Sequence, residues 1–200
     1  MGVWVKKADI NHKDELKQYH CLDGPARIWT GERWGKTNHN GRKEWWVNGR
    51  RHRTDGPAII YPNGRQDWYI DGRKGRVDGP AVIRTNGSEE WWLNSVLHRE
   101  GGLPAIIRSN GTKQWYYNGL LHRTDGPAVI MADGRKEWWV NGLTHRLDGP
   151  AKIWPNYVED WWVMGEQMGS DEVKLLNRKV IINKVLNHGI KESSTDSIIE

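Results

Sequence analysis

The hydrophobic and polar positions of the chain follow a pattern that repeats about every 23 residues. Each repeat holds two short runs that alternate apolar and polar residues, such as 58–61 and 65–70, with an Asn-Gly or Asp-Gly step between them. Alternating runs joined by such a step are typical of a β-hairpin. Because the connections are too short to hold a crossover helix, the strands must be antiparallel. The pattern therefore predicts an all-β repeat array, an elongated antiparallel β-meander of stacked hairpins.

Six repeats of about 23 residues occupy residues 20–167. They start at His20, His52, Gly75, His98, His122 and His145. The first repeat has extra residues at about 30–40, and the pattern does not assign them a role. Residues 1–19 include Trp4-Val5, which resembles the second half of a decayed repeat. We interpret residues 1–19 as an N-terminal cap with a partial repeat.

Residues 168–200 have a different pattern from the repeats. An acidic first turn after Ser170 and helical spacing of the apolar residues predict a short C-terminal helix that ends at Gly189, followed by a tail. The end of a sheet would otherwise expose unpaired N–H and C=O groups. We therefore expect this helix to act as a cap on the array.

Comparison of the six repeats with one another assigns the faces of the predicted sheet. Three positions never change: an Ala, an Ile two residues later, and the first aromatic residue of each pair, which is always Trp. A three-residue loop such as 62–64, with Gly64 in the left-handed conformation, places these three positions on one face, where a core is expected. The position between Ala and Ile varies from Ile59 to Lys152, and we expect it to face outward.

The opposite face then carries the second aromatic residue of each pair, beside a position that holds Arg in two central repeats. Two residues before the second aromatic, this face carries an Asp or Glu in five of the six repeats and Gln114 in the other. This face provides most of the candidate partner-binding residues. The aromatic candidates are Trp46, Tyr69, Trp92, Tyr116, Trp139 and Trp162, and the arginines are Arg84 and Arg108.

Composition adds to this picture through its aromatic residues and its charge. The chain has 14 Trp and 6 Tyr but no Phe, so every aromatic side chain has a polar group. The net charge is +5. The single cysteine, Cys21, cannot form an internal disulfide, and we find neither a signal peptide nor an apolar run long enough to span a membrane. These signs predict a cytoplasmic protein.

Recurring His and Asp residues could suggest a metal site or an acid–base pair. Equivalent residues two strands apart are separated by about 9–10 Å, which is too far for ligands of one zinc ion. We interpret them as structural turn residues, and we expect no catalytic residue, no metal and no cofactor. In four repeats an Arg at the start of the turn stands two residues before an Asp, which predicts a ladder of ion pairs. Arg99 lacks that Asp, so it is a further candidate for partner binding.

The segment 46–52, Trp-Val-Asn-Gly-Arg-Arg-His, is followed by Gly-Pro-Ala, an Ile strand and an Asn-Gly turn. It resembles the MORN repeat, and it is similar to the divergent variants found in antitoxin-type and phage-encoded proteins. The resemblance covers residues 20–165 and implies a non-catalytic scaffold or binding module. Its phage link implies an inhibitor of a host defence component, acting in the host cytoplasm.

Three kinds of function are compatible with these residues. The first is binding of a protein partner through the second aromatic residues of the pairs, which we call the aromatic strip, since Trp, Tyr and Arg dominate binding hot spots. The second is binding of nucleic acid or a nucleotide by base stacking on Trp and Tyr with help from Arg. The third is recognition of a quaternary ammonium group. We favour the protein partner, because the carboxylates beside the aromatic residues would repel phosphates.

Overall fold

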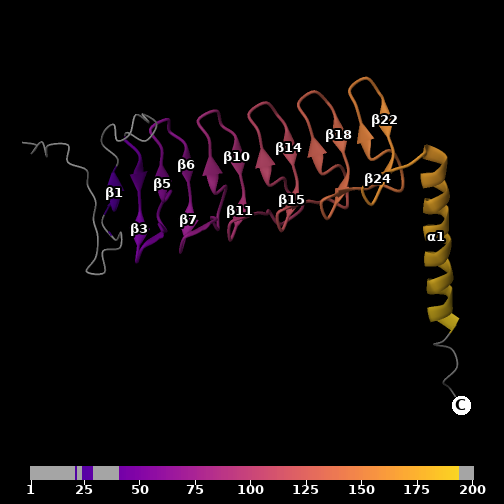
Figure 1. The fold of residues 1–200 in the computed structure, drawn as a ribbon. Coiled ribbons are helices and arrows are strands. Elements are labelled where there is room, and N and C mark those ends of the chain that lie inside the picture. The colour runs from indigo at the N-terminus through magenta and orange to yellow at the C-terminus, as the bar shows by residue number, and fades with distance from the viewer. Residues whose placement is uncertain (1–20, 22–23, 29–40, 194–200) are drawn as a thin grey trace, which may run out of the picture. The chain divides into compact units, whose positions relative to one another are not determined.

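In the computed structural model of the chain, the structure describes residue 21, residues 24–28 and residues 41–193. The predictions for residues 1–19, for the extra residues at 30–40 and for the end of the tail lie outside these residues. The described chain is a series of β-hairpins followed by one helix, which confirms the predicted all-β repeat array with a helical cap (Figure 1). It divides into two compact units, residues 1–120 and residues 121–200.

The first unit contains a sheet whose strands follow one another in sequence order and pair antiparallel. Its eight strands are β1 (Arg27–Ile28), β2 (Lys43–Glu44), β5 (Ile59–Ile60), β6 (Gln66–Asp67), β9 (Val82–Ile83), β10 (Glu89–Glu90), β13 (Ile106–Ile107) and β14 (Lys113–Gln114). The second unit contains four sheet strands, β17 (Val129–Ile130), β18 (Lys136–Glu137), β21 (Lys152–Ile153) and β22 (Glu159–Asp160).

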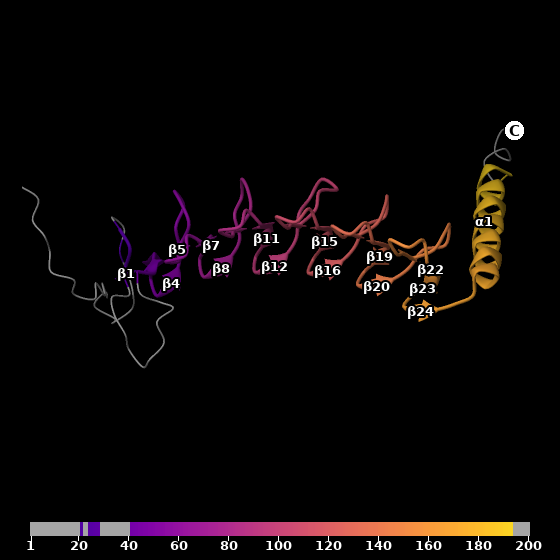
Figure 2. The same ribbon diagram turned by 90° about the horizontal axis from the view of Figure 1, so that it is seen from above.

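A second, smaller hairpin follows each pair of sheet strands. In the first unit these small hairpins are β3–β4 (Trp46–Val47, Arg50–Arg51), β7–β8 (Tyr69–Ile70, Arg73–Lys74) and β11–β12 (Trp92–Leu93, Val96–Leu97), with β15 (Tyr116–Tyr117) after them. β16 (Leu120–Leu121) spans the boundary between the units. In the second unit they are β19–β20 (Trp139–Val140, Leu143–Thr144) and β23–β24 (Trp162–Val163, Glu166–Gln167). Within the first unit, β8 and β12 lie on the same side of the sheet (Figure 2).

Two kinds of turn set the register of the described hairpins. In the sheet hairpin, Tyr61 and Arg65 close a three-residue loop, and Gly64 has a φ of 84°, as predicted. In the small hairpin, Val47 pairs with Arg50, so two residues form the turn, and both have positive φ. A two-residue turn of this kind matches the twist of the strands that it joins.

The small hairpins of neighbouring repeats are linked by backbone and histidine hydrogen bonds. The Gly72 N–H donates to the Arg51 carbonyl at 2.8 Å, and the Asp71 N–H donates to His52 Nδ1 at 3.1 Å. His98, His122 and His145 accept from the next turn in the same way. The turn role predicted for the histidines is therefore confirmed, and the backbone bond between Gly72 and Arg51 links the second repeat to the first.

The structure confirms part of the predicted core and corrects the rest: the Ala position is fully buried, as at Ala58, and Trp68 and Trp115 are buried, but the Ile position is not. The residues expected to face outward are buried, with 1% exposure for Ile59, 0% for Val82 and 1% for Val129, whereas Ile60 is half-buried. The reason is that the small hairpins fold over the face that carries Ile59. Lys74 on β8 reaches Asp67 of β6, directly opposite Ile59, at 3.4 Å. We call this side of the sheet the covered face.

The helix α1 (Ser170–Ser193) follows the last repeat and continues through Gly189, which does not end it as predicted. Its described side chains, up to residue 184, meet the repeats near the first turn. Val173 is fully buried, and Lys174 Nζ lies 5.7 Å from the centre of the Trp161 ring. Farther along, Ile181 and Ile182 are more than half exposed. The first turn therefore anchors the helix to the array.

Substitution of neighbouring residues on β5 tests the corrected core. We expect Ile59→Ala to lower the free energy of unfolding by about 2–4 kcal/mol, because a buried side chain leaves a cavity. Ile60→Ala, its matched control on the opposite face, should cost roughly 1 kcal/mol, because the side chain is only half-buried. Urea denaturation followed by tryptophan fluorescence measures both. A larger loss for Ile60→Ala than for Ile59→Ala would contradict the assignment.

Candidate functional site

Buried carboxylates lie on the covered face. In the pairing of the strands, each is the direct cross-strand partner of an apolar or charged residue. Asp67 lies opposite Ile59 and Val82, and Glu90 lies opposite Val82 and Ile106. Their exposures are 1% for Glu44, 1% for Asp67, 6% for Glu90 and 9% for Glu137. Buried charges of this kind must be paired and hydrogen-bonded to be tolerated.

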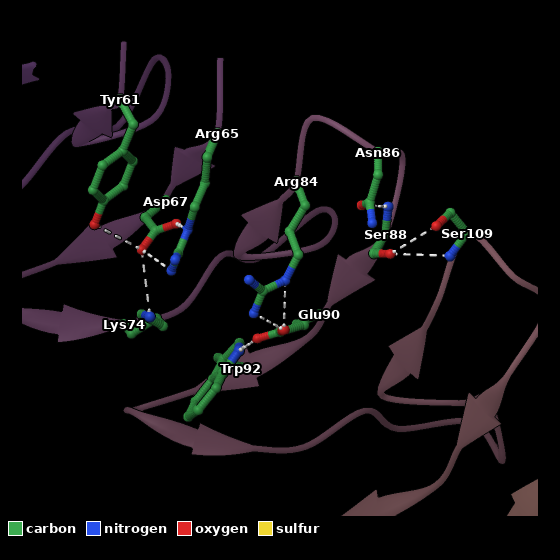
Figure 3. Close-up of polar contacts among 10 residues, drawn as sticks. All are labelled: Tyr61, Arg65, Asp67, Lys74, Arg84, Asn86, Ser88, Glu90, Trp92 and Ser109. Atoms are coloured by element: carbon green, nitrogen blue, oxygen red, sulfur yellow. Dashed lines mark hydrogen bonds and ion pairs between the residues drawn. The ribbon is translucent and has the colours of Figure 1, made fainter. Parts of the chain in front are cut away.

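Asp67 is held by three side chains (Figure 3). Arg65 donates to its two oxygens at 2.7 and 2.9 Å, Lys74 Nζ lies 3.4 Å away, and the Tyr61 hydroxyl lies at 3.5 Å. Burial and the negative charge of Asp67 raise the pKa of Tyr61. The hydrogen bond to Asp67 raises the pKa of Arg65 as well. The tyrosine therefore stays a neutral donor and the arginine a cation.

Glu90 has a similar arrangement in the next repeat (Figure 3). The Arg84 guanidinium donates to Oε1 at 3.1 and 2.5 Å, and the Trp92 indole N–H donates to Oε2 at 3.1 Å. Burial pushes the pKa of Glu90 upward, but the hydrogen bonds and the positive charge of Arg84 outweigh it, so the pKa lies below its ordinary value. Glu90 is thus held as a carboxylate.

The predicted aromatic strip borders these carboxylates. Its rings are half-buried, so the structure corrects the expectation of an open aromatic face. The members are Trp46, Tyr69, Trp92, Tyr116, Trp139 and Trp162. Indole N–H groups of the strip donate to the carboxylates, at 3.1 Å from Trp46 to Glu44 and at 2.9 Å from Trp139 to Glu137. The rings are therefore oriented by the covered face.

Cations lie over the faces of several rings in the strip. The Arg51 guanidinium is 5.0 Å from the Trp46 ring and 5.6 Å from the Tyr69 ring. Lys74 lies between Tyr69 and Trp92 at 5.6 and 5.0 Å. In the second unit, Lys152 lies 4.8 Å from Trp162. Such contacts stabilise a cation over an aromatic face, and they occupy faces that base stacking would need.

The three predicted arginines have different surroundings. Arg84 belongs to the Glu90 ion pair. Arg108 is exposed, and within the described part of the chain it has no ion pair. Arg99 stacks on Trp91 at 3.7 Å and donates to the Pro104 carbonyl at 3.0 Å. Burial lowers the pKa of Arg99, and the negative charge of Glu89 raises it by less, so the pKa lies below its ordinary value.

The predicted Arg–Asp ladder forms in three places. Arg53–Asp55, Arg123–Asp125 and Arg146–Asp148 are 2.8, 2.9 and 2.9 Å apart. In each, a hydrogen bond from the arginine lowers the pKa of the aspartate. Arg76 differs: it stacks on Trp68 at 4.5 Å, but among the described residues it makes no ion pair with Asp78. The ladder is therefore interrupted at Arg76 as well as at Arg99.

An exposed apolar row on the outer side of the small hairpins was not predicted. Its members in the first unit are Ile70, Leu93, Val96, Tyr117 and Leu120, which are 37–53% exposed. Leu93 and Val96 are direct cross-strand partners, on the side of their hairpin away from Trp92 and Leu97. The two-residue turn determines these pairs, so the sequence contained a usable signal: apolar residues on both sides of the Asn-Ser and Asn-Gly turns. We call these five residues the apolar row.

Comparisons with known proteins give no relative: no protein-family model matches the chain, and a search of curated proteins finds no match. Among the described residues, no helix combines the length and the apolar character needed to cross a membrane. Within the same residues, no cluster of His, Cys, Asp or Glu is arranged to bind a metal ion.

The pKa of Glu90 makes a prediction about acid stability. Because the folded-state pKa lies below the ordinary value of 4.5, the carboxylate stabilises the fold above that pH, and the contribution is lost as the pH falls through the folded-state pKa. We expect the unfolding free energy of Glu90→Gln to fall less than that of the unsubstituted protein between about pH 7 and about pH 3. Urea denaturation at each pH measures this. Glu100→Gln, which removes an exposed carboxylate, is the control, and an unchanged pH dependence in Glu90→Gln would contradict the prediction.

Proposed function

We propose that the chain is a non-catalytic binding protein and that it binds a protein partner through the apolar row. The observation that carries this proposal is the row itself: five large apolar side chains, each 37–53% exposed, lie on the outer side of successive small hairpins. A contiguous exposed apolar surface on a folded protein usually marks an interaction site. A repeat array is suited to this role, because it presents equivalent positions side by side.

The packing between hairpins supports treating the row as one surface. The Gly119 N–H donates to the Leu97 carbonyl at 2.9 Å, which joins the hairpin of Leu93 and Val96 to the turn before Leu120. A Cβ atom at Gly119 would lie 2.9 Å from Val96 Cγ1, so the two hairpins are in close contact there. The apolar side chains therefore continue from one repeat to the next.

The aromatic strip supports this surface from the inner side. Trp92 and Leu93 are consecutive on β11 and point to opposite sides, the first toward Glu90 and the second outward. The buried carboxylates also favour a binding role over catalysis. The same arrangement recurs at Glu44, Asp67, Glu90 and Glu137, where it serves the packing of each repeat, whereas an active site needs a set of residues that occurs once.

The proposal predicts that charge in the apolar row abolishes binding without unfolding the protein. We expect Val96→Glu/Leu120→Glu to reduce capture of the partner by at least about tenfold, because each carboxylate would be desolvated in the interface. Both side chains are 40–50% exposed, so the fold should tolerate them. The measurement is affinity capture from the native cell with quantitative mass spectrometry, followed by binding to the purified captured protein.

Thr54→Glu/Thr85→Glu is the matched control, since it adds the same charge at exposed positions outside the row. Equal capture by both double variants would contradict the proposal. Salt-sensitive retention of an oligonucleotide that depends on the rings of the strip would instead support the nucleic-acid alternative. The identity of the captured protein decides whether it is a host defence component, as the resemblance to phage-encoded proteins implies.

A further inference from the structure

A groove of about 720 Å³ lies beside the apolar row, and its lining comes mainly from the second, third and fourth repeats. Its lining includes Ile70 and Leu93 of the row together with Arg76, Trp91, His98 and Arg99. The groove is therefore continuous with the surface proposed for partner binding, but its lining is different in character. Four arginines line it against two carboxylates, Asp71 and Glu100.

The two ladder arginines that lack an aspartate partner both line this groove. Arg76 stacks on Trp68 and Arg99 stacks on Trp91, so indole rings hold both guanidinium groups in place. In the repeats where the ladder is intact, the aspartate forms an ion pair with the guanidinium group, as Asp55 does at 2.8 Å from Arg53. Arginine donates in a planar fork that fits a carboxylate. In this groove, within the described residues, no carboxylate of the chain takes that place on Arg76 or Arg99.

A buried polar atom in the same groove also lacks a partner. His98 is 7% exposed, and its Nδ1 accepts from the Asn118 N–H at 3.1 Å. Its Nε2 is buried without a hydrogen-bond partner, and the Glu100 carboxylate lies 4.0 Å from it. Because Nδ1 is the acceptor, the neutral ring carries its proton on Nε2 and can donate from there. An unsatisfied buried donor is costly unless a ligand completes it.

We propose that this groove binds an acidic side chain of the protein partner, with Arg76, Arg99 and His98 as the groups that recognise its carboxylate. The inference rests on the proposed function and names the chemistry of the partner segment: a carboxylate flanked by apolar residues. Leu93 and Ile70 contact the apolar residues of the segment. Asp71 and Glu100 disfavour a polyphosphate chain, because several phosphates would bring more negative charge past these two carboxylates than one carboxylate does.

The test uses the full chain and two fluorescein-labelled peptides, one of alternating Leu and Glu and one of alternating Leu and Gln. Fluorescence anisotropy should show the Glu peptide binding at least about tenfold more tightly than the Gln peptide. Arg76→Gln and Arg99→Gln should each weaken binding of the Glu peptide by about tenfold, because each removes a charge-assisted hydrogen bond. Arg53→Gln, at an equivalent position outside the groove, should leave it unchanged.

Circular dichroism checks that each variant is folded. If Arg99→Gln unfolds, because Arg99 also bonds the Pro104 carbonyl, Arg76→Gln and the two peptides decide the question. Equal binding of the two peptides, or no effect of Arg76→Gln, would overturn the proposal for the groove without affecting the proposal for the apolar row. The proposal for the apolar row fails separately, if Val96→Glu/Leu120→Glu captures the partner as well as the unsubstituted protein does. Absence of binding by either peptide, or tighter Arg76-dependent binding of oligothymidylate, would also overturn the acidic segment as ligand.

Discussion

The covered face depends on the requirement that a buried carboxylate be surrounded by donors. Asp67 and Glu90 sit in register with Ile59, Val82 and Ile106, in a layer that would otherwise be apolar. Removing one partner of such a group leaves an uncompensated charge, which is strongly destabilising. The chain meets this requirement with arginine, lysine, tyrosine and indole donors. Trp92 and Trp139 serve this requirement in a chain with 14 Trp and no Phe, since a phenyl ring has no N–H or O–H to donate.

Much of the fold could be predicted because it is determined by local turn chemistry. The Asn-Gly steps and their spacing fix the hairpins, and Gly64 marks the left-handed residue of its loop. Comparing repeats identified the buried Ala position but could not predict that the next position, that of Ile59, is buried as well. Lys152 occupies the column of Ile59, but it stacks on Trp162, so variation there reflects a cation–π contact rather than exposure to water. Variation within a column is therefore a poor measure of burial in this array.

The candidate site was predictable only in part. An Arg followed by an Asp two residues later predicts an ion pair, and Arg53 and Asp55 form it, but Arg76 and Asp78 have the same spacing and do not. The difference depends on side-chain conformation, which spacing does not specify. The apolar row went unrecognised because the aromatic residues next to it were a stronger compositional signal. Alternation along β11 places Trp92 and Leu93 on opposite sides, and the two-residue turn pairs Leu93 with Val96.

The links between successive small hairpins have a consequence for how the protein opens. The Gly72 N–H donates to the Arg51 carbonyl of the repeat before it, and the Gly119 N–H donates to the Leu97 carbonyl, so each link reaches no farther than the neighbouring repeat. Nearest-neighbour coupling allows partial unfolding to begin at the termini and to proceed one repeat at a time. Most of the groove is carried by the second to fourth of six repeats, which fraying reaches after the terminal ones. Terminal repeats can therefore be lost before most of the surface that we assign to recognition is.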